Sequence, residues 1–213
     1  MPTPVSAPDA RPLVGDVVRL DLATEADAAE LFEALDDERV WAAGHGGGPA
    51  GRPRDVEGTR RILETALAAH ARGERVPYVV RLSADSPLGE AGTVVGTTSI
   101  GDLDLVNERA HVGWTAYGVP WWGTAVNAEC KLLLLGHAFD DCGFGRIKIQ
   151  TDAINARSQA AIAKLGATRE GVLRRHLRRA DGTFRDTVVF SVLRDEWPAV
   201  RAGLLARLSR TNP

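Results

Sequence analysis

The stretch from Val112 to Leu135 has the clearest chemical potential in the chain, because a strand-like run passes through a small-residue turn directly into a long apolar-striped helix. We expect the helix to begin near Thr124, where Gly123 and Ala125 add almost no side-chain bulk. The N–H groups of a first helical turn lack partners inside the helix and carry the positive end of its dipole. The turn could therefore hold a pyrophosphate, although a glycine that merely turns the chain gives the same local pattern.

Three other groups of side chains suggest competing chemistry. The run 45–48 matches the oxyanion loop of esterases, but the nearest nucleophile candidate, 97–101, lacks the first glycine of Gly-x-Ser-x-Gly. His137 and Asp141 lie one helical turn apart with no third ligand, so no metal site is expected. The basic run 174–179 could contact an acidic acceptor or RNA, although a solvated strand face is the commoner arrangement.

The composition limits the class of protein. The 213 residues are 44% hydrophobic and 25% charged, which is typical of a folded domain, and a net charge of −2 gives no reason to expect nucleic acid or a membrane surface. The longest apolar runs are far shorter than the roughly 20 residues that span a bilayer. Residues 1–12 hold four prolines and no signal-peptide core. We expect a flexible tail over 1–12, one domain over 13–213, and a cytoplasmic location.

The elements that position these groups alternate between strands and helices. Short connections predict an antiparallel meander from 76 to 117, and the crossover through the following helix makes the strands near 112 and 146 parallel neighbours. Asp181-Gly182 predicts a hairpin turn. The fold class is therefore α/β (α+β) with a mixed sheet. Strands are expected at 17–22, 76–82, 93–100, 110–117, 146–151, 168–177 and 183–193, and helices at 24–35, 37–42, 55–71, 124–141, 156–164 and 198–208.

A second pair of motifs follows one crossover later. Asn155-Ala156-Arg157-Ser158 opens a helix that leads to Gly166, and Asp181-Gly182-Thr183-Phe184-Arg185-Asp186 comes after it. Together with Pro120–Ala125, these motifs resemble the GNAT superfamily of acyl-CoA-dependent N-acetyltransferases, in its RimJ/RimL-like branch, over about residues 15–197. The resemblance implies a mostly antiparallel central sheet with helices on both faces. The loop departs from the family pattern at Pro120, where Gln or Arg is usual, so any side-chain contact there is lost.

The resemblance also implies how acetyl-CoA would be held, without a metal. The strand backbone around 114–116 would pair with the pantetheine arm, and amides from 123 to 127 would take the pyrophosphate. Asn155 would contact the co-substrate through its amide, although an ordinary helix N-cap explains it equally well. The implied cofactor-binding residues are Trp114, Thr115, Ala116, Trp122, Gly123, Thr124, Ala125, Val126, Asn127, Asn155 and Ser158.

Direct attack of an amine on the thioester gives an oxyanion, which a backbone N–H of the strand 112–117 can stabilise. The family's serine makes Ser158 the candidate for protonating the thiolate, and a capping hydroxyl is its alternative. The tyrosine that many members use falls at Ile162, so a tyrosine acid is excluded there.

The general base is His111 in this interpretation, at a position where the branch often carries glutamate. A neutral imidazole is a competent base near pH 7, directly or through one water. An isolated strand histidine is more often structural. Glu108 and Glu129 are the alternative bases, and composition favours a solvated position for Glu129.

The sequence therefore predicts an N-acetyltransferase that moves acetyl from acetyl-CoA to a primary amine, either a protein N-terminus or a small molecule. The loop 44–53 is expected to be mobile and to line the acceptor pocket. The rival function is a non-catalytic acyl-CoA-binding or sensing domain, which needs neither Ser158 nor a base. No nucleic-acid or membrane partner is expected, and family habit suggests a homodimer.

Overall fold

The computed structural model describes residues 4–211 and contains an eight-stranded sheet with the order β1-β2-β3-β4-β5-β6-β8-β7. Neighbouring strands are antiparallel except for β5 and β6, which run parallel as the crossover predicted. The strands are β1 Leu13–Val14, β2 Val18–Leu22, β3 Arg75–Leu82, β4 Val94–Asp104, β5 Arg109–Tyr117, β6 Arg146–Asp152, β7 Thr168–Arg178 and β8 Phe184–Leu193.

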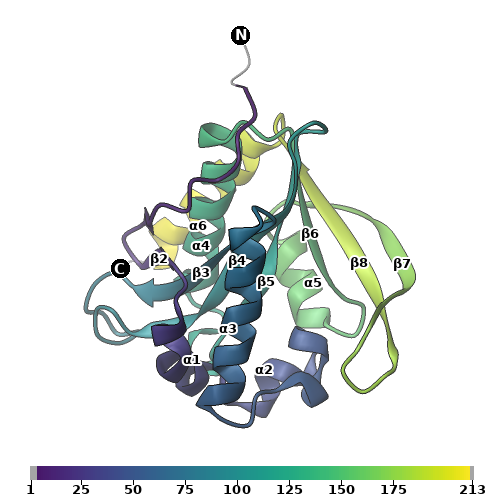
Figure 1. The fold of residues 1–213 in the computed structure, drawn as a ribbon. Helices are drawn as coiled ribbons and strands as arrows, with labels where there is room; N and C mark the ends of the chain where they lie inside the picture. Colours follow the sequence, from purple (N-terminus) through teal and green to yellow (C-terminus); the bar gives the residue numbers. More distant parts are fainter. Residues whose placement is uncertain (1–3, 212–213) are drawn as a thin grey trace.

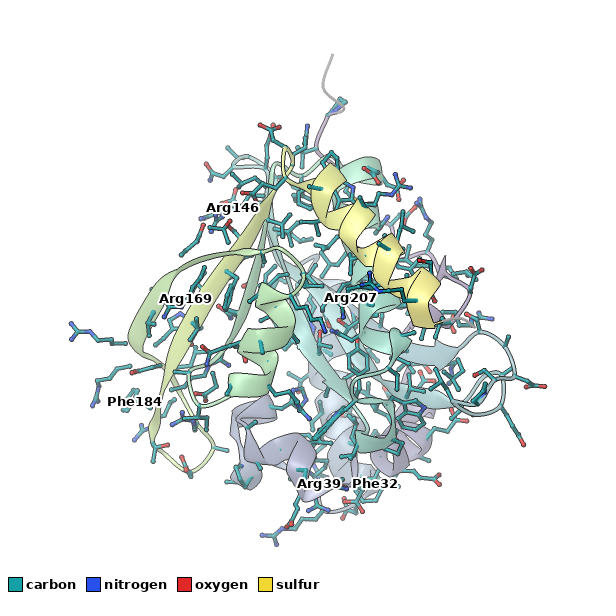
Figure 2. The ribbon with its side chains drawn as sticks, turned by 180° about the vertical axis from the view of Figure 1, so that it is seen from behind. Phe32, Arg39, Arg146, Arg169, Phe184 and Arg207 are labelled. Carbon is teal, nitrogen blue, oxygen red and sulfur yellow. The ribbon has the colours of Figure 1, made fainter. Side chains whose placement is uncertain are left out.

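Helices cover both faces of this sheet, which confirms the predicted fold class. Helices α1 and α3 pack on β3 and β4 at the front of Figure 1, with α2 below them, whereas α4, α5 and α6 lie on the opposite face, which Figure 2 brings forward. The α-helices are α1 Ala28–Leu35, α2 Glu38–Ala42, α3 Val56–Ala71, α4 Ala125–Gly136, α5 Ala156–Ala163 and α6 Trp197–Thr211.

Side-chain alternation along the strands divides the core into two clusters. In β3, Val76, Tyr78 and Val80 are buried in the cluster that includes residues of α4 and α6, whereas Val79 is buried on the α1–α3 side. Successive strand residues point to opposite faces, so one strand serves both layers. The two cysteines are buried and free.

Capping residues fix the helix starts on the α1–α3 face. Asp55 accepts the Gly58 N–H at 2.7 Å at the start of α3, and Asp37 accepts the Arg39 N–H at 2.9 Å at the start of α2. Asp27 accepts the Thr24 N–H at 2.7 Å, completing the capping box that precedes α1. Each cap satisfies an N–H that the helix cannot pair internally.

The structure differs from the predictions made from the sequence in three places. The helix expected over 124–141 ends at Gly136, and 137–141 form a π-helical turn. The short strand β1 was not predicted. Glu129 is buried rather than solvated, because its carboxylate accepts N–H groups of the chain between β1 and β2, from Val17 and Val18 at 2.6 Å and Asp16 at 3.1 Å.

The N-terminal segment runs alongside the end of α4. The Ser6 N–H donates to the Cys142 carbonyl at 2.9 Å, and Arg11 pairs with Asp141 at 2.5 Å. Residues 1–3 of the expected tail lie outside the described residues, and the flexibility of the tail stays a prediction, as does the single domain over 13–213. No helix among the described residues combines the length and apolar character needed to cross a membrane.

Candidate active site

The centre of the sheet opens where the two parallel strands separate. Strand β5 pairs with β6 at three positions, of which His111↔Lys148 is the last, although both strands continue beyond it. The β4–β5 ladder is irregular between Thr97 and Ser99, opposite Trp114, whose φ is 51°. A bulge bends its strand and increases the local twist. The far half of β5 therefore presents one edge that has no strand partner among the described residues.

Backbone groups on alternate residues of β5 face this opening. The Gly118 N–H donates to the Val95 carbonyl at 3.0 Å, so the backbone groups of Tyr117 point away from β4. By the same alternation, the backbone groups of Thr115 face the opening, whereas Ala116 pairs with Thr97 of β4. The strand edge therefore offers the outward backbone groups of Thr115 and the N–H of Tyr117 to an added extended chain, while the Tyr117 carbonyl accepts from the Trp122 indole.

The loop after β5 leads to the start of α4. Thr124 caps the helix, since its Oγ1 accepts the Val126 N–H at 3.3 Å and donates to the Trp121 carbonyl at 2.8 Å. Gly123 has a φ of 77°, and a Cβ placed there would meet nothing within 4 Å. The space beside the first turn of α4 is thus open, as an anion site at its N–H groups requires.

Helix α5 reaches the same loop from the other side of the opening. The guanidinium carbon of Arg157 lies 3.1 Å from the ring centroid of Trp122, and the indole N–H of Trp122 donates to the Tyr117 carbonyl at 2.7 Å. Asn155 is an N-cap, because its Oδ1 accepts the Ser158 N–H at 2.9 Å. The contact between α5 and the loop brings the two sequence motifs together. Sequence reasoning gave no role to Arg157.

His111 is buried at the closed end of the opening, with a side chain only 4% exposed. Its ring lies 4.7 Å from that of Trp114, and Nδ1 is 3.3 Å from Oδ2 of Asp102, an ion-pair distance if the ring is protonated. Neither ring nitrogen makes a hydrogen bond to the described residues. Burial lowers the pKa of His111, although Asp102 opposes that shift, so the imidazole is neutral near pH 7, as a base requires.

The two alternative bases have other positions. The carboxylate of Glu129 is used by the backbone N–H groups before and within β2. Glu108 precedes β5 with a φ of 50°, and its carbonyl accepts the N–H groups of Gly145 and Arg146. Neither contact places a carboxylate in the opening. His111 is therefore the candidate base that the geometry supports best.

A buried lysine behind β5 was missed from the sequence. Lys131, in α4, is 5% exposed, and its ammonium donates to Oγ1 of Thr115 at 3.0 Å. That hydroxyl also lies 2.8 Å from Oγ1 of Thr98. Burial lowers the pKa of Lys131, and no carboxylate pairs with it among the described residues. It sits in a helical run of leucines, so neither composition nor spacing distinguishes it.

The other sequence motifs do not form the chemistry they suggested. The His45 ring lies 5.0 Å from the Trp41 ring at an interplanar angle of 59°, and burial, aided by the charge of Arg75, lowers the pKa of His45 to about 4. Ser99, the esterase candidate, lies inside β4 and accepts from Arg75. In the basic run, Arg179 is not free in solvent, because it pairs at 2.9 Å with buried Asp152.

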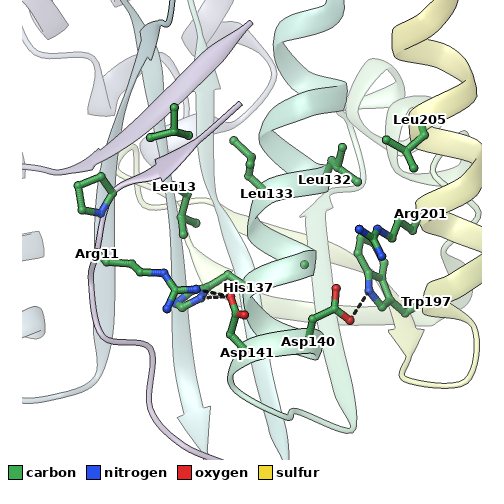
Figure 3. A pocket seen from close by; sticks show the side chains of 13 residues that line it. Arg11, Leu13, Leu132, Leu133, His137, Asp140, Asp141, Trp197, Arg201 and Leu205 are labelled. Carbon is green, nitrogen blue, oxygen red and sulfur yellow. Dashed lines mark hydrogen bonds and ion pairs between the residues drawn. The ribbon is translucent and has the colours of Figure 1, made fainter. Parts of the chain in front are cut away.

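A separate hollow of about 380 Å³ lies between the N-terminal segment, α4 and α6 (Figure 3). His137 and Asp141 line it, with Nδ1 and Oδ2 2.9 Å apart. Within the described part of the chain, no three His, Cys, Asp or Glu side chains gather in a way that could hold a metal ion.

Comparison with known proteins gives consistent matches. Residues 18–168 match the acetyltransferase (GNAT) domain model. The curated Bacillus subtilis (strain 168) protein called "Putative ribosomal N-acetyltransferase YdaF" is 32% identical over 107 residues, which are 50% of this chain and 57% of that protein. The match thus spans little more than half the length of that relative.

Solved structures share nearly the whole fold. A GCN5-related N-acetyltransferase from Brucella melitensis has a TM-score of 0.84 with 26% identity, covering 97% of this chain and 89% of its own. Mycobacterium smegmatis RimJ, solved in complex with CoA-disulfide, has a TM-score of 0.73 with 25% identity, covering 94% of this chain and 95% of its own.

Proposed function

The chain belongs to the GNAT family of acetyltransferases, and on that premise we propose that it transfers acetyl from acetyl-CoA to a primary amine. The observation that carries the proposal is the opening between β5 and β6, which leads along an unpaired strand edge to the uncovered start of α4. Two chemical features of acyl-CoA match these two features of the protein. The extended pantetheine arm matches the strand edge, and the pyrophosphate matches the uncovered start of α4. The RimJ neighbour, solved with CoA-disulfide, supports the same donor.

The donor would lie along β5. Thr115 and Tyr117 offer backbone groups to the pantetheine arm, and Trp114 and Ala116 flank them. The pyrophosphate would accept from N–H groups of the turn and the first helical turn, at Gly123, Thr124, Ala125, Val126 and Asn127. Trp122 and Asn155 would border the same space, from the loop and from the N-cap of α5, in keeping with the contact of Arg157 with Trp122.

In the proposed reaction, the amine nitrogen bonds to the thioester carbon, and the carbon–sulfur bond then breaks to release the CoA thiolate. His111 takes the proton that the amine loses, directly or through one water. The Ser158 hydroxyl donates to the thiolate sulfur. A backbone N–H on the open edge of β5 stabilises the oxyanion between the two steps.

The acceptor is a protein N-terminus or a small-molecule amine in this proposal. The name of the Bacillus subtilis relative favours a ribosomal acceptor, and its match covers only part of that protein. The opening alone carries no information on the acceptor, because the features that match it belong to the donor.

Thiol release from acetyl-CoA with a panel of amines and peptides tests the function. We expect turnover by the wild type, a large loss of kcat in Ser158→Ala and His111→Ala, and retained acetyl-CoA binding in both variants. Tight CoA binding with no turnover for any acceptor, unaffected by either substitution, would instead indicate the sensing domain.

A further inference from the structure

We propose that Arg75 recognises a carboxylate on the acceptor, so that the preferred substrates are amines carrying an acidic group close to the amine nitrogen. This inference rests on the proposed acetyl transfer at the same site. It follows from an arginine on β3 that makes no ion pair with the described residues, and from Trp114 and His111 of β5 on the far side of β4.

Arg75 differs in its partners from Arg81 and Arg179, two other half-buried arginines. Arg81 pairs with Asp27 at 2.5 Å, and Arg179 pairs with Asp152 at 2.9 Å. Arg75 makes no ion pair within the part of the chain that the structure describes. Its Nε donates to Oγ of Ser99 at 2.8 Å, which fixes the plane of the guanidinium. The two Nη groups remain available to a ligand.

The guanidinium stacks on the ring that separates it from the candidate base. Its carbon lies 4.4 Å from the ring centroid of Trp114, and that ring lies 4.7 Å from the His111 ring. Trp114 is 36% exposed and occupies the β5 bulge with a positive φ. In the sheet, Arg75 pairs with Gly101 and Gly101 with His111, so the cation and the base lie in one row. A single small acceptor could span both.

No carboxylate of the described residues forms an ion pair with Arg75. Burial lowers the pKa of Arg75 to about 10, so it remains charged at pH 7. Asp102 attracts it from a distance, but the Asp102 carboxylate is paired with Lys148 at 2.9 Å. The charge of Arg75 also lowers the pKa of His45 in the loop 44–53. A partly desolvated cation without a partner gains more from an incoming anion than a solvated one does.

A carboxylate suits this cation best. The two free Nη groups form a planar fork that matches the two oxygens of a carboxylate, and stacking on an aromatic ring preorganises that fork. The buried His111 ring nitrogens, which have no hydrogen-bond partner among the described residues, lie at the other end of the row. The site thus presents a cation for the acid and a base for the amine.

The test compares acceptors that differ only in charge. Initial rates of thiol release are measured for amino acids against their carboxamides, for peptides with acidic against neutral first residues, and for an amine bearing a phosphate. The wild type should favour the carboxylate member by about 30-fold or more in kcat/KM, the value for a desolvated charge pair. The amino-acid and peptide arms identify the source of the carboxylate, and a phosphate preference overturns the choice of a carboxylate.

Variants assign the preference to Arg75. Arg75→Gln should remove most of the preference while changing rates for the neutral members less than about threefold, and Arg75→Lys should restore part of it. Arg61→Gln, at an exposed arginine that pairs with Glu57 on α3, is the matched control and should keep the preference. Equal wild-type rates within each pair, or an equal loss for both members in Arg75→Gln, would overturn the proposal.

Two binding measurements separate this inference from the proposed function. Calorimetry with acetyl-CoA should give the same affinity for wild type and Arg75→Gln, and failure of the wild type to bind would contradict the transferase function itself. Titration with glutarate, using its diamide as the neutral control, should change the tryptophan fluorescence of the wild type but not of Arg75→Gln. The same response in both proteins would refute carboxylate recognition even if no acceptor is turned over.

Discussion

At the scale of single residues, burial decides what the titratable groups can do. His111 and Lys131 are both nearly inaccessible, and desolvation lowers the pKa of each. A neutral imidazole can accept a proton, whereas the buried amino group of Lys131 lies next to a hydroxyl in surroundings that disfavour its charged form. The sequence makes the histidine a candidate base at a position where the family branch often carries glutamate, but the lysine lies among leucines and only its contact with Thr115 reveals it.

The pH dependence of turnover should report His111. Because burial lowers its pKa below the usual value of 6.5, kcat/KM should rise as the ring loses its proton below that pH and should be level at pH 7. A pH profile of thiol release measures this, and His111→Gln should remove the acidic limb together with most of the activity. An unchanged limb in His111→Gln would assign the base to another group.

We expect Lys131 to lower the stability of the fold and to raise the rate of turnover. Lys131→Met removes, at similar volume, a buried amino group that no carboxylate pairs with among the described residues, so we expect the free energy of unfolding to stay equal or to rise by about 1 kcal/mol. The value of kcat should fall, because the hydrogen bond that holds Thr115 on β5 is lost. Urea unfolding and thiol release measure the two effects, and Thr115→Val tests the connecting hydroxyl. Full activity in Lys131→Met would make the lysine a packing residue.

At the scale of elements, the predictable parts are those with local causes. The short connections of the meander and the Asp181-Gly182 turn predicted most strands nearly to their ends, because these signals act over a few residues. The stack of Arg157 on Trp122 and the burial of Glu129 between distant segments could not be predicted, since each needs two elements already placed.

The turn before α4 allows a matched substitution. Gly123 and Gly73 have φ values of 77° and 71°, and a Cβ at either meets nothing within 4 Å. Aspartate at either position should therefore cost a similar backbone strain. Gly123→Asp should abolish binding of acetyl-CoA by bulk and charge repulsion, whereas Gly73→Asp, between α3 and β3, should leave binding unchanged. Calorimetry compares the two, and equal affinities would refute the pyrophosphate assignment.

At the scale of the whole molecule, the single parallel strand pair explains where the site lies. The crossover through α4 places β6 beside β5 for a few residues only, and the N-terminus proposed to bind the pyrophosphate belongs to the helix that makes this crossover. The order of elements in the sequence was sufficient to predict this arrangement. The extent of the opening was not, because it depends on the bulge at Trp114, where a non-glycine residue has a positive φ.

A structure of the protein with acetyl-CoA bound tests the central claim most directly. We predict the pantetheine arm along the open edge of β5, paired with Thr115 and Tyr117, and the pyrophosphate within hydrogen-bond distance of the N–H groups from 123 to 127. Density for the co-substrate elsewhere, for example in the hollow between α4 and α6 lined by His137 and Trp197, with the start of α4 left empty, would contradict the account.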